Sequence, residues 1–285
     1  MPSFISVLVV SAVLLTGSSH ANNDYAGVDR LQQLLENNMS PAFQTITIQH
    51  SRLAEQAGSS LTPSIATIFS DPAVNTAIIQ QNPVAALDLP HKVLVYTHDK
   101  NTAFITATPD EYLKKRHGGI DDQALSAFHT RLSSILKNID TDLILPLNLN
   151  QLVPGYGIIK HDSKYNFDRT YQRFKEEVLG NNDDTLWFGE IDFTADAAKL
   201  GTRLPRMKLL LFGAPAPGAK AMTDFKLLGL NAFCQKVLLI EQQDKVRLYT
   251  NDIAALTRLY YKDTHPSHHM INLRLNRAYK RITND

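Results

Sequence analysis

The feature that most constrains the fold of this chain is an internal duplication. When the second half is laid on the first with a shift of 143 residues, and one further residue is inserted before the last strands, the same pattern returns. The matching segments are residues 61–72 with 204–215, residues 92–95 with 236–239, and Thr106 with Thr250. Two halves that present the same elements in the same order predict two similar domains.

We place the first domain at residues 22–140 and the second at residues 155–285. Residues 141–154 between them carry two prolines and alternate leucine with polar residues, which is typical of a linker or an edge strand. In each half, short apolar runs joined by tight turns are accompanied by amphipathic helices. This order predicts an α+β fold of two tandem domains, each an antiparallel sheet with helices on one face, and not a doubly wound parallel sheet.

The second domain has one predicted strand more than the first. Residues 156–160 read as a strand that precedes its first helix, whereas the first domain has no room for one between Ala21 and Val28. Two interpretations remain open at this point. Either the first sheet lacks this strand, or residues 143–149 of the linker supply it.

The composition is that of a soluble globular protein, with 44% hydrophobic and 20% charged residues in 285. The net charge of +1 does not favour a nucleic-acid partner or an anionic membrane surface. Cys234 is the single cysteine, so no intramolecular disulfide forms. The chain must therefore be stabilised by its core.

The N-terminus resembles a secretory signal. Residues 1–21 contain no charged residue, residues 4–15 are apolar, and small residues follow up to Ala21. This pattern predicts a signal peptide cleaved after Ala21 and a periplasmic location, although the basic residue usual near the start is missing. The alternatives are an uncleaved anchor or a buried N-terminal strand. We expect no membrane span after signal removal.

A basic helix end stands out in the first domain. Thr108 and Pro109 predict the start of a helix, with the Thr108 side chain accepting from backbone N–H groups. Gly118 predicts its end. Arg116 and His117 therefore fall in the last turn, where cations interact favourably with the helix macrodipole.

Four cationic or proton-active side chains form the candidate ligand-binding site. They are His50, Lys92, Arg116 and His117. The matching positions of the second domain hold Phe193, Lys236, Tyr260 and Tyr261. We therefore expect a small cleft in the first domain that the second has lost, with Arg116 able to bind a carboxylate through two parallel hydrogen bonds.

Each candidate also has a purely structural interpretation. Arg116 and His117 satisfy the helix dipole without any ligand. Lys92 can extend its stem along the sheet so that its charge reaches water. His50 can simply be a polar residue at the end of a strand.

Other chemistry is poorly supported. His265, His268 and His269 lie close together at a predicted helix start, but no cysteine or carboxylate cluster accompanies them, so we predict no metal site and leave their role open. No cofactor is predicted, because the chain lacks a dinucleotide fingerprint, a phosphate loop and a haem-attachment motif. No catalytic residue is assigned.

The first domain closely resembles the domain-of-unknown-function family 302 (DUF302). The residues that carry the resemblance are His50, Ala54, Gly58, residues 61–69, Pro72, residues 87–96, Tyr112, Leu113 and residues 116–118. The second domain resembles a diverged copy, and it departs from the family at Phe193, Phe233, Cys234, Tyr260 and Tyr261.

This resemblance implies a compact α+β domain with a TATA-binding-protein-like β-α-β4-α arrangement. Members of the family are thought to pair as dimers, so a tandem chain would build an intramolecular pseudo-dimer of its two repeats. The family has no established activity, and the resemblance implies no reaction.

Three functions remain open. The first is a periplasmic module that binds a small anionic ligand in the first repeat. The second is an enzyme that uses the same His/Lys/Arg cleft for acid–base chemistry. The third is a structural or protein-interaction pseudo-dimer.

Overall fold

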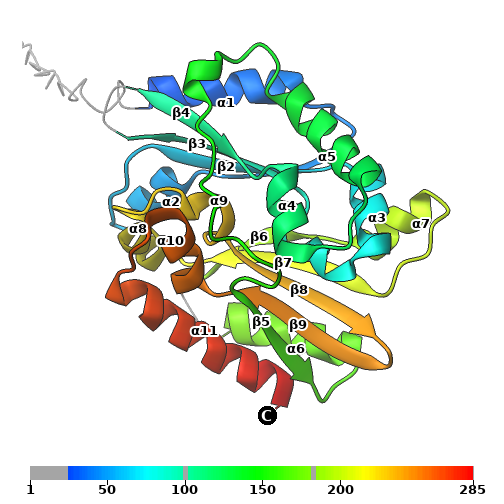
Figure 1. Cartoon of the computed structure of the whole chain (residues 1–285). Helices are drawn as coiled ribbons and strands as arrows, with labels where there is room; N and C mark the ends of the chain where they lie inside the picture. Colours follow the sequence, from blue (N-terminus) through cyan, green and yellow to red (C-terminus); the bar gives the residue numbers. More distant parts are fainter. Residues whose placement is uncertain (1–24, 99–101, 181–183, 285) are drawn as a thin grey trace, which may run out of the picture.

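A computed structural model describes residues 25–98, 102–180 and 184–284, and in it the two halves of the chain form two antiparallel sheets (Figure 1). The predicted signal peptide at residues 1–21 lies outside the described residues. The first half contains α1 (Ala26–Asn38), β1 (Gln44–Ile48), α2 (His50–Gln56), β2 (Ser64–Ser70), α3 (Pro72–Gln81), the 3₁₀ turn η1 (Pro83–Leu87), β3 (His91–Thr97), β4 (Ala103–Ala107), α4 (Asp110–His117), α5 (Asp122–Ile135) and the 3₁₀ turn η2 (Thr141–Leu143).

The second half repeats this order and adds one strand at its start. It contains β5 (Ile158–Ser163), α6 (Phe167–Gly180), β6 (Leu186–Ile191), α7 (Phe193–Lys199), β7 (Met207–Gly213), α8 (Pro215–Met222), α9 (Leu228–Asn231), β8 (Gln235–Gln242), β9 (Lys245–Asn251), α10 (Ile253–Tyr261) and α11 (Pro266–Asn284). The sheets have the orders β1-β2-β3-β4 and β5-β9-β8-β7-β6. The predicted α+β class with two antiparallel sheets is confirmed.

The extra strand β5 lies beside β9, at the edge that corresponds to the free edge of β4 in the first sheet. The linker runs along that edge of β4. Ile144 forms a parallel bridge with Ile105, and the backbone N–H of Leu145 donates to the Ile105 carbonyl at 2.7 Å. The first sheet thus has four strands, and the linker covers its edge at the place where β5 covers the second.

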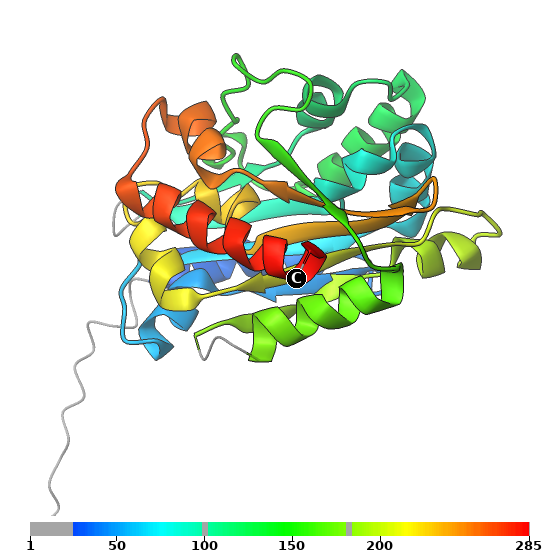
Figure 2. The ribbon, with the colours of Figure 1, turned by 90° about the horizontal axis from the view of Figure 1, so that it is seen from below.

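Side chains alternate between the two faces of each strand, and both faces are buried. On β3, Val93 and Val95 face outward against α1 and α5, while Lys92 and Leu94 face the other half of the molecule. The outer face of the second sheet is covered in the same way by α6 and α11, which lie in front of it in Figure 2. The chain is therefore layered as helices, sheet, sheet and helices.

The inner faces of the two sheets share one apolar core. Ile48 and Ile68 of the first half pack in the same cluster as Leu209, Leu211 and Leu238 of the second. The edges β1 and β6 also meet, because the Gln44 side chain donates to the Glu190 carbonyl at 2.9 Å. Polar side chains on the inner faces are thereby enclosed between the two halves.

Within the described ranges, no helix is both long enough and apolar enough to cross a membrane.

Candidate functional site

Two lysines lie buried where the inner faces of the sheets meet. Lys92 of β3 is 2% exposed and Lys236 of β8 is 3% exposed. The strand registers place them at corresponding positions, since Lys92 pairs with Ile68 on β2 and Lys236 pairs with Leu211 on β7. Burial lowers the pKa of Lys92 well below its ordinary value, and the nearby charge of Lys236 lowers it further. The side-chain nitrogens of two lysines are thus held together away from water.

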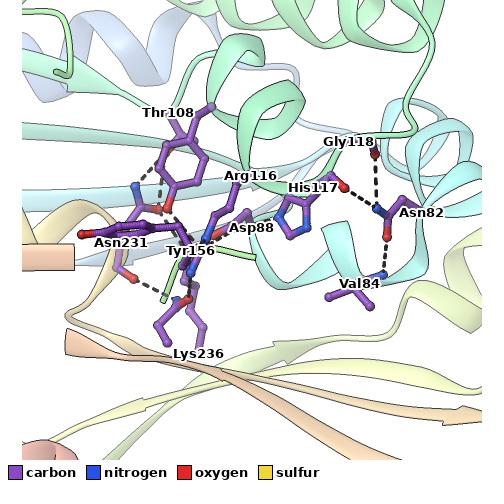
Figure 3. Close-up of polar contacts among 12 residues, drawn as sticks. Asn82, Val84, Asp88, Thr108, Arg116, His117, Gly118, Tyr156, Asn231 and Lys236 are labelled. Atoms are coloured by element: carbon purple, nitrogen blue, oxygen red, sulfur yellow. Dashed lines mark hydrogen bonds and ion pairs between the residues drawn. The ribbon is translucent and has the colours of Figure 1, made fainter. Parts of the chain in front are cut away.

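The carboxylate between these groups belongs to Asp88, directly after η1 (Figure 3). Its side chain is fully buried, with Arg116 Nη1 at 2.7 Å, His117 Nε2 at 2.8 Å and Lys236 Nζ at 3.3 Å. Lys92 Nζ donates to the main-chain carbonyl of the same residue at 2.5 Å. Burial alone would raise the pKa of Asp88, but the charges of Arg116 and Lys236 and the His117 hydrogen bond hold it well below its usual range.

We call Asp88, Lys92, Arg116, His117 and Lys236 the Asp88 cluster. In this cluster, all three nitrogen atoms of the Arg116 guanidinium donate hydrogen bonds. Nε donates to the Tyr156 carbonyl at 2.9 Å, Nη1 to the Tyr112 hydroxyl at 3.1 Å, and Nη2 to Asn251 Oδ1 at 2.8 Å. These bonds join α4 to the second half of the chain.

Asn231 extends the hydrogen-bond network on the side of the second half. Its Nδ2 donates to the Tyr260 hydroxyl at 2.9 Å, and Lys236 Nζ lies 3.4 Å from its Oδ1. The Thr108 hydroxyl also lies 3.4 Å from Asn231 Oδ1 (Figure 3). The prediction that Thr108 caps α4 is therefore wrong. The helix begins at Asp110 without a side-chain cap, because the Thr108 side chain is engaged across the interface instead.

The predicted helix end is found where expected. α4 ends at His117, and Gly118 follows with a φ of 64°, a conformation that glycine adopts without strain. Arg116 and His117 are in the last turn, as predicted, but both side chains turn to Asp88. The helix macrodipole alone therefore does not explain these two side chains, because both contact the negatively charged carboxylate of Asp88.

Three of the four predicted ligand-binding residues converge and one does not. Lys92, Arg116 and His117 all contact Asp88, whereas His50 lies elsewhere, with its Nε2 at 3.2 Å from the Gly229 carbonyl. Burial lowers the pKa of His50 to about 4, so the ring is neutral near pH 7. Whether the predicted residues bind a ligand stays a prediction.

The sequence interpretation missed the residues that complete the cluster. Asp88 was a single acidic residue within an apolar run, which is an unusual place for an unpaired carboxylate and could have drawn attention to it. Lys236 was recognised as the match of Lys92 but was assigned to a copy that had lost the site. Asn231 and Asn251 carried no signal, because their role depends on how the two halves pack.

The Asp88 cluster is closed to solvent in this structure. The side chains of Asp88 and Arg116 are 0% exposed, and those of His117 and Lys236 are 1% exposed. The backbone around Gly157 covers Arg116, since a Cβ at that glycine would lie 3.9 Å from Nη2.

The remaining candidates have structural partners. His268 is buried at the start of α11, where its Nδ1 accepts from the His265 backbone at 3.0 Å and its Nε2 lies 2.9 Å from the Ala221 carbonyl. In the part of the chain that the structure describes, no group of three or more His, Cys, Asp or Glu side chains is arranged to hold a metal ion. Burial raises the pKa of the Cys234 thiol to about 12, so it is no thiolate near neutral pH.

Comparisons with known proteins agree with the duplication. The sequence profile of the family described as "Domain of unknown function DUF302" matches residues 26–139 and again residues 159–282. Among solved structures, the chain is similar to an uncharacterized conserved protein DUF302 from Bacillus stearothermophilus, with 13% identity and a TM-score of 0.38 over 45% of this chain and 96% of that one. No curated protein matches. Because the two profile matches span well over half of the sequence, the chain belongs to the DUF302 family and carries its domain as a tandem repeat.

Proposed function

We propose that this protein binds a small anionic ligand at the Asp88 cluster. The observation that carries the proposal is the imbalance of charge: one carboxylate is buried with a guanidinium, two lysine amines and an imidazole. Buried charges are stable only when they are paired, so a second anion would be favoured there. Its natural partner is Lys92, whose Nζ donates to the main-chain carbonyl of Asp88 and lies beside the Lys236 side chain.

The depressed pKa of Lys92 gives the proposal a measurable signature. An anion beside Lys92 favours its charged form, so binding takes up protons from solution. We expect malonate or inorganic phosphate to bind the purified protein with proton uptake, measured by isothermal titration calorimetry in buffers of different ionisation enthalpy. Lys92→Met, which keeps the stem and removes the charge, should abolish the proton uptake and weaken binding by about tenfold or more.

Lys199→Met is the matched control, since Lys199 is an exposed lysine of α7 that pairs with Asp196 at 2.9 Å. It should leave binding unchanged. If neither anion binds the wild-type protein, or if Lys92→Met binds both as well as wild type does, the proposal fails.

We further propose that the two repeats act as an intramolecular pseudo-dimer in which the second completes the site of the first. Support comes from the bonds between the halves, which run from Arg116 to Asn251 and Tyr156 and from Lys236 to Asp88. On this proposal the second repeat has not simply lost a site. It supplies Lys236 to the shared one.

The cellular location is also a proposal: the protein is exported to the periplasm and its signal is cleaved after Ala21. The support is the uncharged, apolar start of the chain and its small residues up to Ala21. Mass spectrometry of the protein from fractionated cells should find a chain that begins at Asn22 in the periplasmic fraction. A cytoplasmic chain that retains residues 1–21 would contradict the proposal.

A further inference from the structure

A second feature lies away from the Asp88 cluster, on the outer face of the second sheet. A cavity of about 90 Å³ lies between this face and helices α6, α8 and α11. Its walls are mainly apolar, with Val178, Phe212, Phe233 and Leu275 among them, and Gln235 and Tyr279 are polar side chains that line it. Apolar cavities with a few polar groups are typical of small-molecule sites.

Tyr279 lines the cavity and is 2% exposed. In the described ranges, no hydrogen bond of its hydroxyl to another residue is found. Burial alone raises its pKa. The hydroxyl is therefore available to a ligand atom that enters the cavity.

Gln235 offers the complementary group. Its Nε2 donates to the Ala232 carbonyl at 2.8 Å, which leaves Oε1 without a donor among the described residues. Besides Thr185, Arg274 and Arg281, the cavity thus presents one hydroxyl and one amide oxygen on mainly apolar walls.

The first repeat explains why this space exists. There, the His91 ring is stacked between Phe69, at a centroid distance of 4.9 Å, and Phe128 of α5, at 3.8 Å. Phe69 and His91 are register partners on β2 and β3, and Phe212 and Gln235 are register partners on β7 and β8. The outer face of the first repeat is therefore filled by a third ring, that of Phe128.

The second repeat lacks that stack. Gln235 stands at the register position of His91, so three stacked rings cannot form there. The side chains of α11 that line the cavity include Ile271, Leu275 and Tyr279.

The charges at the cavity walls are already neutralised. Arg274 pairs with Asp184 at 2.8 Å, and Arg281 pairs with Glu177. A neutral ligand therefore fits better than an anion, which separates this cavity from the Asp88 cluster.

We propose that the second repeat binds a neutral single-ring aromatic molecule with a hydroxyl group, a phenol. The ring lies in the cavity between the outer face of the second sheet and α11. The ligand hydroxyl accepts from the Tyr279 hydroxyl and donates to Gln235 Oε1.

The test compares 4-methylphenol with toluene, which has a similar shape but no hydroxyl. Dissociation constants are measured by ligand-observed NMR on the purified full chain and on Tyr279→Phe, which keeps the ring and removes the hydroxyl. Wild type should prefer 4-methylphenol, and Tyr279→Phe should lose about tenfold of that affinity while its affinity for toluene is unchanged.

Two variants of α11 locate the site. Ile271→Phe places a larger side chain in the wall of the cavity and should abolish binding of both compounds. Leu273→Phe, at a position 45% exposed on the same helix, should change neither. If Ile271→Phe does not fold, Tyr279→Phe decides alone. The proposal is overturned if wild type binds neither compound at millimolar concentration, or if Tyr279→Phe keeps the full preference for 4-methylphenol.

Discussion

At the scale of single residues, the Asp88 carboxylate is held by three side chains that carry or can carry positive charge. It contacts Arg116, His117 and Lys236 and is completely buried. A buried ion pair contributes little net stability compared with an apolar pair, but removing one partner leaves the other charge unpaired. The stability of this protein should therefore be unusually sensitive to the charge at position 88.

Asp88→Asn keeps the shape of the side chain and removes its charge, leaving two buried cations without a counter-charge. We expect the free energy of unfolding in urea at pH 7 to fall by about 3–5 kcal/mol. Asp122→Asn is the control, because the Asp122–Lys114 pair, at 2.9 Å, is similar in length to the Asp88 contacts but exposed to solvent. It should leave the urea midpoint nearly unchanged. Equal losses of unfolding free energy in the two variants would show that burial of the Asp88 ion pairs does not make them more important for stability.

Wild type and Asp88→Asn should also differ in how their unfolding free energy depends on pH. The folded-state pKa of Asp88 is depressed, so its contribution to stability is fully present above the unfolded pKa of about 4 and is lost as pH falls through the folded value. Asp88→Asn has no such contribution. The difference in unfolding free energy between wild type and Asp88→Asn should therefore shrink as urea titrations move from pH 7 down through the range below 4.

At the scale of helices and strands, local patterns predicted most of the architecture. The apolar runs of β3 and β8 were recognisable because both faces of each strand are buried, and α4 was recognisable from its ending at Gly118. The hydrogen-bond partner of the Thr108 hydroxyl was not predictable in this way. A threonine before a helix normally caps it, and only the approach of Asn231 from the other half redirects its hydroxyl.

The candidate site was predictable only in part, for the same physical reason. Lys92, Arg116 and His117 were singled out because each is a polar group at an informative position in a local pattern. Their common partner Asp88 lies in a separate segment, and Asn251 contacts Arg116 from the far half of the chain. Such contacts are set by packing between the halves, about which local periodicity carries no information.

At the scale of the whole molecule, the two copies have diverged in complementary ways. The inner face of each repeat is now covered by the other repeat. Leu94 of β3 packs closely against Gly229 of α9, where an added Cβ would lie 3.0 Å from Leu94 Cδ1. The outer faces have diverged independently, with an aromatic stack in the first repeat and a cavity in the second. Divergence after duplication has thus changed polar and aromatic residues while both sheets were retained.

This dependence predicts how the molecule behaves when it is divided. Residues 22–154 and 155–285 expressed as two polypeptides should copurify as a one-to-one complex, because each alone would expose the apolar face that now forms the shared core. The linker stays with the first part, since Ile144 and Leu145 pair with Ile105 of β4. Leu94→Asp, which places a charge in the interface, should prevent copurification, whereas Leu34→Asp, at a position 36% exposed on α1, should not. Sedimentation analysis distinguishes the outcomes. Two well-folded monomers that do not associate would refute the intramolecular pseudo-dimer and, with it, the shared site at Asp88.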